Sequence, residues 1–236
     1  GRNHIHLEKF DSAHMTVEQL LDYIKEGTDD RLYAISQLMW MGVDASLICD
    51  ITQIDMFFVD KIKKIVDLEK ELEASPGSVE LLREAKRSGF SDSYVAELWG
   101  DTTDNIYKLR CEENIFPVYK MIDTCASEFD SYVPYFYSTY AEENESIVSD
   151  KPKIIVLGSG PIRIGQGVEF DYSTVHAVRT IKQLGYEAIV INNNPETVST
   201  DYTAADKLYF EPLTPEDVMN VVHLEKPLGV IATLGG

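Results

Sequence analysis

The sequence has few of the features that mark disulfide-rich, zinc-binding or membrane proteins. It contains only three cysteines in 236 residues, Cys49, Cys111 and Cys125. They are too few and too scattered for a disulfide framework or a zinc site, and reduced thiols in a cytoplasmic protein are expected. No apolar run approaches the roughly 18 residues that cross a bilayer, and no signal sequence opens the chain. No membrane association is therefore expected. The first residue is Gly1 and not Met, which suggests a piece of a longer chain.

Basic residues are also scarce. Lys and Arg total 21 against 40 Asp and Glu, a net charge of −19. This balance argues against a nucleic-acid partner, because affinity for phosphate backbones depends on clustered Lys and Arg. The excess lies mostly in residues 1–150, with 14 basic and 30 acidic side chains, whereas residues 151–236 have 7 and 10. A polar stretch ending at Pro152 predicts a linker, so we expect two domains, 1–148 and 149–236.

The first region has the pattern of amphipathic helices. Apolar residues recur at spacings of three and four from Phe58 to Leu72, and Asp55 and Pro76 mark the two ends of this helix. Further helices are expected at 16–26, 31–41, 78–87, 91–99 and 102–111. The first domain is therefore predicted to be all-helical.

Within this region lies a weak repeat at an offset of 47 residues. Gly42, Ile48 and Ile62 correspond to Gly89, Val95 and Leu109, and each copy predicts a glycine, a short helix, a turn and a second helix. One interpretation is a DNA-binding helix-turn-helix with residues 102–110 as the recognition helix. The other is helical packing. Residues 91–116 hold two basic and six acidic side chains, which would repel phosphates, so packing is favoured.

Residues 117–140 form an aromatic segment with little helical period. The aromatic side chains that crowd it between Tyr119 and Tyr140 could seal a domain junction or a subunit contact. Equally, the segment could be irregular and pack on the core of the helices. The sequence leaves both interpretations open.

The second region alternates strands and helices. Strands are expected at 154–157, 188–191, 208–210 and 229–232, and helices at 173–184 and 214–225. This β-α-β-β-α-β order predicts an open, mostly parallel sheet. Ligands of such sheets bind beyond the carboxyl ends of the strands, here the glycine-rich loop, the Asn192–Pro195 loop and Gly235–Gly236.

The glycine-rich loop spans residues 158–167. Gly158 and Gly160 fit a dinucleotide fingerprint, but Arg163 occupies the place of its third glycine. A P-loop fails as well, because Gln166 follows Gly165 where lysine is required. Such a turn can bind a small anion or allow a close backbone approach. The alternative is a tight turn without a ligand.

Several long motifs resemble the large subunit of carbamoyl phosphate synthetase. They are residues 153–172 (KIIVLGSGPIRIGQGVEFDY), 192–201 (NNNPETVSTD) and 208–214, together with 117–126 and 137–143 upstream. The resemblance implies an all-helical oligomerisation domain followed by a Rossmann-like, pre-ATP-grasp parallel-sheet subdomain, which begins the second synthetic half. It covers essentially the whole chain.

The resemblance implies an ATP-dependent ligase that makes carbamoyl phosphate from bicarbonate, glutamine-derived ammonia and two ATP, for arginine or pyrimidine biosynthesis. The parent enzyme would use ATP and Mg²⁺ or Mn²⁺ and a glutaminase small subunit, and would self-associate through the helical domain. This fragment is expected to bind neither cofactor and to be inactive alone. The competing hypothesis is a non-catalytic helical interaction module fused to an α/β small-ligand-binding domain.

The resemblance also implies roles for individual residues. A carbamate tunnel of the family would pass the loop at Gly167 and Glu169, with Arg163 and Glu196 nearby. A glycine at 167 leaves room for a small molecule to pass, and a shielded tunnel protects labile carbamate from water. A structural ion pair between Arg163 and Glu196 is the alternative. No catalytic residue and no metal ligand is expected in the fragment.

Overall fold

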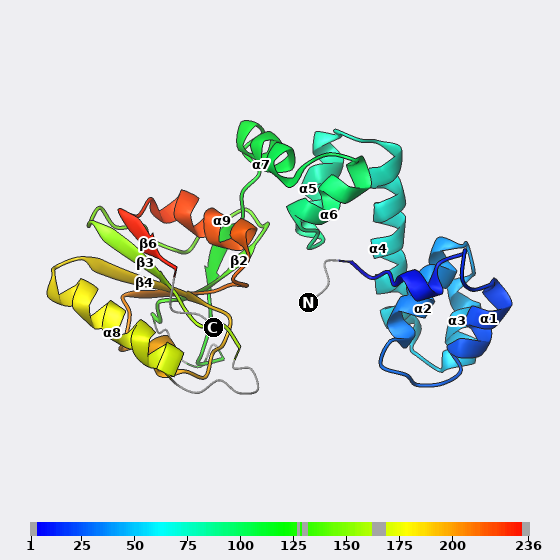
Figure 1. Ribbon diagram of the computed structural model, residues 1–236, viewed down its shortest axis with the longest axis horizontal. Coiled ribbons are helices and arrows are strands. Elements are labelled where there is room, and N and C mark those ends of the chain that lie inside the picture. Colours follow the sequence, from blue (N-terminus) through cyan, green and yellow to red (C-terminus); the bar gives the residue numbers. More distant parts are fainter. Residues whose placement is uncertain (1–3, 127, 129–131, 162–168, 233–236) are drawn as a thin grey trace. The chain divides into compact units, whose positions relative to one another are not determined.

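The computed structural model describes residues 4–126, 128, 132–161 and 169–232. The chain divides into two compact units, residues 1–115 and residues 116–236 (Figure 1). Each unit has its own hydrophobic core, and each is described separately.

The first unit is helical, as the sequence predicts. Its elements are η1 (Glu8–Phe10), α1 (Val17–Tyr23), α2 (Arg31–Trp40), α3 (Ala45–Thr52), α4 (Met56–Ala74), α5 (Val79–Arg87), α6 (Asp92–Trp99) and α7 (Thr103–Glu112). The long helix α4 begins after Asp55, whose carboxylate caps it by accepting a hydrogen bond from the backbone N–H of Phe57. Side-chain oxygens that cap free backbone N–H groups in this way fix where a helix starts.

The 47-residue repeat is present in the backbone itself. Gly42 and Gly89 both have φ of 86°, a left-handed conformation that favours glycine. The short helices α3 and α6 begin after the capping residues Asp44 and Ser91 and end at left-handed residues, Gln53 and Gly100. Because caps and glycine turns are local signals, two diverged copies keep the same helical path.

The second unit is a sheet with helices on both faces. Its elements are β1 (Val118–Met121), β2 (Tyr135–Thr139), β3 (Lys153–Leu157), α8 (Glu169–Gln183), β4 (Glu187–Asn192), η2 (Val198–Thr200), β5 (Lys207–Phe210), α9 (Pro215–Glu225) and β6 (Gly229–Ile231). The strand order is β1-β2-β5-β4-β3-β6, and only β1 runs antiparallel to its neighbour. This is the mostly parallel sheet that the alternating pattern predicts.

Alternate side chains of the strands face different helices. Ile155, Ile189 and Ile191 pack in one core with α9, and Val156 and Val190 pack in another with α8. The central strands β3 and β4 are buried on both faces, which is why each appears as a short continuous apolar run.

The compact units of the structure divide at residue 115, upstream of the domain boundary expected between residues 148 and 149. The second compact unit already begins at Phe116, and the aromatic segment forms β1 and β2 of the sheet. Tyr119 and Phe136 are fully buried against Tyr209 in the core that contains α9. Its two strands are therefore part of the sheet, where β2 pairs with β5 and β1 pairs with β2.

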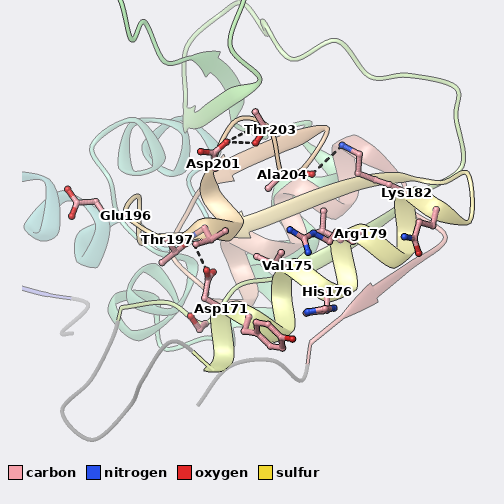
Figure 2. A pocket seen from close by; sticks show the side chains of 15 residues that line it. Asp171, Val175, His176, Arg179, Lys182, Glu196, Thr197, Asp201, Thr203 and Ala204 are labelled. Carbon is pink, nitrogen blue, oxygen red and sulfur yellow. Dashed lines mark hydrogen bonds between the residues drawn. The ribbon is translucent and has the colours of Figure 1, made fainter.

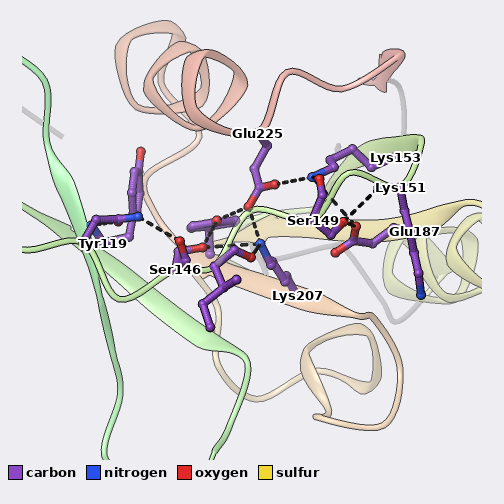
Figure 3. A network of polar contacts seen from close by, with 11 residues as sticks. Tyr119, Ser146, Ser149, Lys151, Lys153, Glu187, Lys207 and Glu225 are labelled. Carbon is purple, nitrogen blue, oxygen red and sulfur yellow. Dashed lines mark hydrogen bonds and ion pairs between the residues drawn. The ribbon is translucent and has the colours of Figure 1, made fainter.

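The polar linker is held by a buried charged cluster at the amino ends of the strands (Figure 3). Glu225, at the end of α9, accepts hydrogen bonds from Lys153 (3.0 Å) and Lys207 (2.7 Å). The two ammonium groups also donate to the backbone carbonyls of Ser149 (2.8 Å) and Ile147 (2.6 Å). The linker is thus attached to the sheet through side chains on β3 and β5.

Ionisation of Glu225 is favoured by this cluster. Burial alone would raise its pKa, but the hydrogen bonds from Lys207 and Tyr209, with the charge of Lys207 and the bond from Lys153, hold the pKa below its usual value. A buried carboxylate paired with two cations is stable only as a complete set, since removing one member leaves an uncompensated charge.

Candidate functional site

Two loops meet at the carboxyl ends of β3 and β4. The backbone N–H of Gly158 donates to the carbonyl of Ile191 (2.8 Å), and that of Gly160 donates to the side-chain oxygen of Asn192 (3.0 Å). The same Asn192 oxygen accepts from the backbone N–H of Asn193 (2.9 Å). Asn192 therefore connects the glycine turn to the Asn-Pro-Glu loop, as expected of adjacent parallel strands.

Gly158 has a steric role in this connection. A Cβ atom at this position would lie 2.5 Å from Cγ of Asn192, closer than real contacts allow. Gly160 has φ of +71°, which also favours glycine. Both turn N–H groups are already bonded within the protein, so neither is free to bind a phosphate in this conformation. At these two glycines the backbone of the turn lies against the side chains of Asn192 and Asn193.

Asn192 also holds an unusual donor. The residue is fully buried, and its Nδ2 atom has no hydrogen-bond partner in the described part of the chain. Buried amide donors are rarely left unpaired. Because Asn192 lies between the two loops, its Nδ2 atom is a polar group of the site that could still donate a hydrogen bond.

A groove of about 910 Å³ opens beside these loops, between α8 and residues 196–204 (Figure 2). Ser159 and Glu196 line it near the strand ends, and Arg179 and Lys182 line it farther along α8. Its apolar wall includes Val175. The groove thus has an apolar wall and is also lined by charged groups of both signs.

Asp171 positions the loop that forms the far wall of the groove. It lies buried in the first turns of α8 and accepts hydrogen bonds from the backbone N–H groups of Val198 (2.9 Å) and Ser199 (3.2 Å). Two such bonds from neighbouring donors fix the orientation of η2 relative to α8. The sequence analysis did not foresee this function of Asp171.

The sequence-predicted site residues have different places in the structure. Glu196 is exposed and lines the groove, and Glu169 is the exposed first residue of α8 without being among the groove residues. Arg163, Gly165 and Gly167 lie outside the described residues. The alternatives of an Arg163–Glu196 ion pair and a passage at Gly167 therefore stay predictions.

Glu211 is a further buried acid at this edge of the sheet that the sequence analysis did not single out. It follows β5, is only 4% exposed, and accepts hydrogen bonds from the backbone N–H and the hydroxyl of Ser138, which lies on β2. Burial raises the pKa of its carboxyl to about 7, more than the Ser138 hydrogen bonds lower it, and Asp217 adds to the increase. The only sequence signal is an acid directly after a buried strand.

Two searches of the described residues bear on metals and membranes. Nowhere in the described ranges do three or more His, Cys, Asp or Glu side chains gather as a metal ion would require. Among the helices formed by these residues, none combines the length and apolar character needed to cross a membrane.

Comparison with protein families gives two matches. Residues 1–114 match the family described as the oligomerisation domain of the carbamoyl-phosphate synthetase large chain. Residues 150–236 match the carbamoyl phosphate synthase preATP-grasp domain. Between them they leave only residues 115–149 unmatched, the stretch that contains β1, β2 and the linker. The order of the two matches agrees with a helical unit followed by an α/β unit.

Proposed function

Since the chain belongs to the carbamoyl phosphate synthetase large-chain family, a family of ligases, we propose that it serves in the glutamine-dependent synthesis of carbamoyl phosphate. The parent enzyme would use bicarbonate, ammonia released from glutamine by a glutaminase small subunit, and two ATP. The helical unit would provide subunit association, and the α/β unit would provide part of the half that phosphorylates carbamate. The match of residues 1–114 to an oligomerisation domain supports the first role.

The observation that carries the second role is the arrangement at the carboxyl edge of the sheet. There, the glycine turn approaches Asn192 closely enough to exclude any Cβ at Gly158, and Glu196 and Ser159 line a groove that opens from the same edge. A turn with two glycines, and the polar side chains of Ser159 and Glu196 beside it, suit the passage of a small, polar, labile species such as carbamate. We propose that Glu196 borders this passage, together with Glu169, Arg163 and Gly167.

Within the described ranges, the residues around the glycine turn do not fit the parent enzyme's ATP and Mg²⁺ or Mn²⁺. Gly158 and Gly160 use their N–H groups inside the turn, and no three potential ligands gather in the described ranges. We propose that nucleotide and metal bind elsewhere in the parent enzyme and that this chain is inactive alone. Isothermal titration calorimetry of residues 1–236 with Mg·ATP should then show no binding in the micromolar range, and micromolar binding would contradict this assignment.

Coupling between the two half-reactions tests the passage. In the full-length large subunit assembled with its glutaminase, Glu196→Ala should lower the carbamoyl phosphate formed per bicarbonate-dependent ATP hydrolysed, because carbamate would escape. The matched control is Glu142→Ala, which removes an exposed acid from the linker and should leave the ratio unchanged. Undiminished coupling in Glu196→Ala would refute the role of Glu196.

A further inference from the structure

The start of α4 carries three consecutive exposed apolar side chains, Met56, Phe57 and Phe58, which we call the Met-Phe-Phe patch. Phe57 and Phe58 are 60% and 61% exposed, and their rings meet edge to face with centroids 5.4 Å apart. The sulfur of Met56 lies 3.8 Å from the thiol of Cys49 on α3. In the described part of the helical unit, exposed large apolar side chains lie only within residues 32–58, and these two rings are the most exposed. Contiguous exposed apolar side chains indicate a contact surface.

The second copy of the internal repeat shows that the fold does not require these side chains. At the 47-residue offset the patch corresponds to exposed polar residues of α7, Thr103, Asp104 and Asn105. Both helices begin after a capping side chain, Asp55 in α4 and Thr102 in α7. The position after the patch is buried and apolar in both copies, Val59 and Ile106. The two copies therefore share the buried residue of the helix start and differ in the exposed ones, so the apolar patch has a purpose other than folding.

The charge around the patch suits a second copy of the same acidic unit. Residues 1–115 hold 13 basic and 23 acidic side chains, so two copies repel each other over most of their surfaces. Residues 50–64, by contrast, hold three Asp and three Lys. Asp60 and Lys64 are among the exposed ones. An apolar centre with a balanced charged border can meet a copy of itself without net repulsion.

From these observations we propose that the Met-Phe-Phe patch is a surface through which two copies of this chain associate. This inference rests on the association role proposed for the helical unit, which the match of residues 1–114 to an oligomerisation domain supports, and it adds where the contact lies. Phe57 and Phe58 would form the centre of the interface. Lys61, whose ammonium group lies 4.9 Å from the centroid of the Phe57 ring, would border it. In a two-fold interface each aromatic side chain is buried twice, and buried aromatic side chains contribute much of the binding energy.

The second copy of the repeat supplies the variant that tests this surface. In the 236-residue chain, Met56→Thr, Phe57→Asp and Phe58→Asn together give α4 the exposed residues that α7 has at the same positions. This triple variant should fold, because Asp55 still caps the helix and an aspartate in the first turn is favourable. Sedimentation velocity over a concentration series measures the dissociation constant, and circular dichroism verifies that each variant is folded.

The matched control is Thr103→Asp. It adds one negative charge at the start of α7, as the triple variant does at the start of α4, but leaves the apolar patch intact. We expect the triple variant to have a dissociation constant about a hundredfold or more above that of the wild type, because two aromatic contacts are lost in each copy. Thr103→Asp should associate like the wild type.

Two results would overturn the proposal, and they bear differently on the proposed function. Equal association of the wild type and the triple variant would overturn the patch but leave association through another face of the helical unit. A wild-type chain that stays monomeric at every concentration would overturn both the patch and the association role, and the patch would then contact another part of the parent enzyme. Neither result affects the proposed passage, which the coupling ratio of Glu196→Ala tests separately.

Discussion

Glu211 is a buried acid whose ionisation should control how the stability of the α/β unit depends on pH. It is 4% exposed, and its carboxylate accepts hydrogen bonds from the backbone N–H and the hydroxyl of Ser138 on the adjacent strand. These two bonds are fewer than a carboxylate has in water. Burial therefore raises its pKa from 4.5 to about 7.

The direction of the pH effect follows from where the proton is held. Between pH 4.5 and about 7 the folded unit keeps a proton on Glu211 that the unfolded chain has released. The free energy of unfolding consequently falls as pH rises through this window and is constant above it. A shift of this size corresponds to roughly 3 kcal/mol in total, of which about 2–3 kcal/mol is lost between pH 5 and pH 8.

The perturbation is Glu211→Gln, which cannot ionise and still offers an oxygen to Ser138. We compare the free energy of unfolding of the variant with that of the wild type at each pH. The difference, variant minus wild type, should be about 2–3 kcal/mol larger at pH 8 than at pH 5. Urea unfolding followed by far-ultraviolet circular dichroism measures this difference. The only two tryptophans, Trp40 and Trp99, lie in the helical unit, so their fluorescence serves as an internal control that should not change.

Glu196→Gln is the matched control, because it removes an exposed acid from the same unit. It should unfold with the pH dependence of the wild type. If Glu211→Gln also keeps the wild-type pH dependence, Glu211 is ionised in the folded state at pH 5, and the reasoning from burial is refuted.

Two substitutions test the packing of the same unit. Gly158→Ala should destabilise it by about 1–3 kcal/mol, because the new Cβ would lie 2.5 Å from Cγ of Asn192; Gly229→Ala, where a Cβ meets nothing within 4 Å, is the control, and equal midpoints in urea would contradict the steric argument. Glu225→Ala should cost about 3–5 kcal/mol, because it leaves Lys153 and Lys207 buried without their carboxylate. A loss below about 1 kcal/mol for Glu225→Ala would mean that water reaches the two lysines.

The candidate site was only partly predictable from the sequence. The convergence of the glycine turn with the Asn-Pro-Glu loop follows from two parallel strands that each end in a loop, and the structure confirms it. The function of Asp171 was not predictable, because its partners Val198 and Ser199 lie 27 and 28 residues away and present only backbone N–H groups. The role of Glu211 was not predictable either, because its partner Ser138 lies 73 residues away in the chain.

The sequence by itself determined the local elements of this protein. These include the helix starts at Asp55 and Thr214, the glycines that end helices, and the 47-residue repeat. Each depends on residues close together in the chain, so each can be recognised without the fold. The tertiary structure alone decided that residues 116–148 belong to the α/β unit. It also decided which charges are buried together. Strand pairing and burial bring together residues far apart in the chain, and no short stretch of sequence records its distant partners.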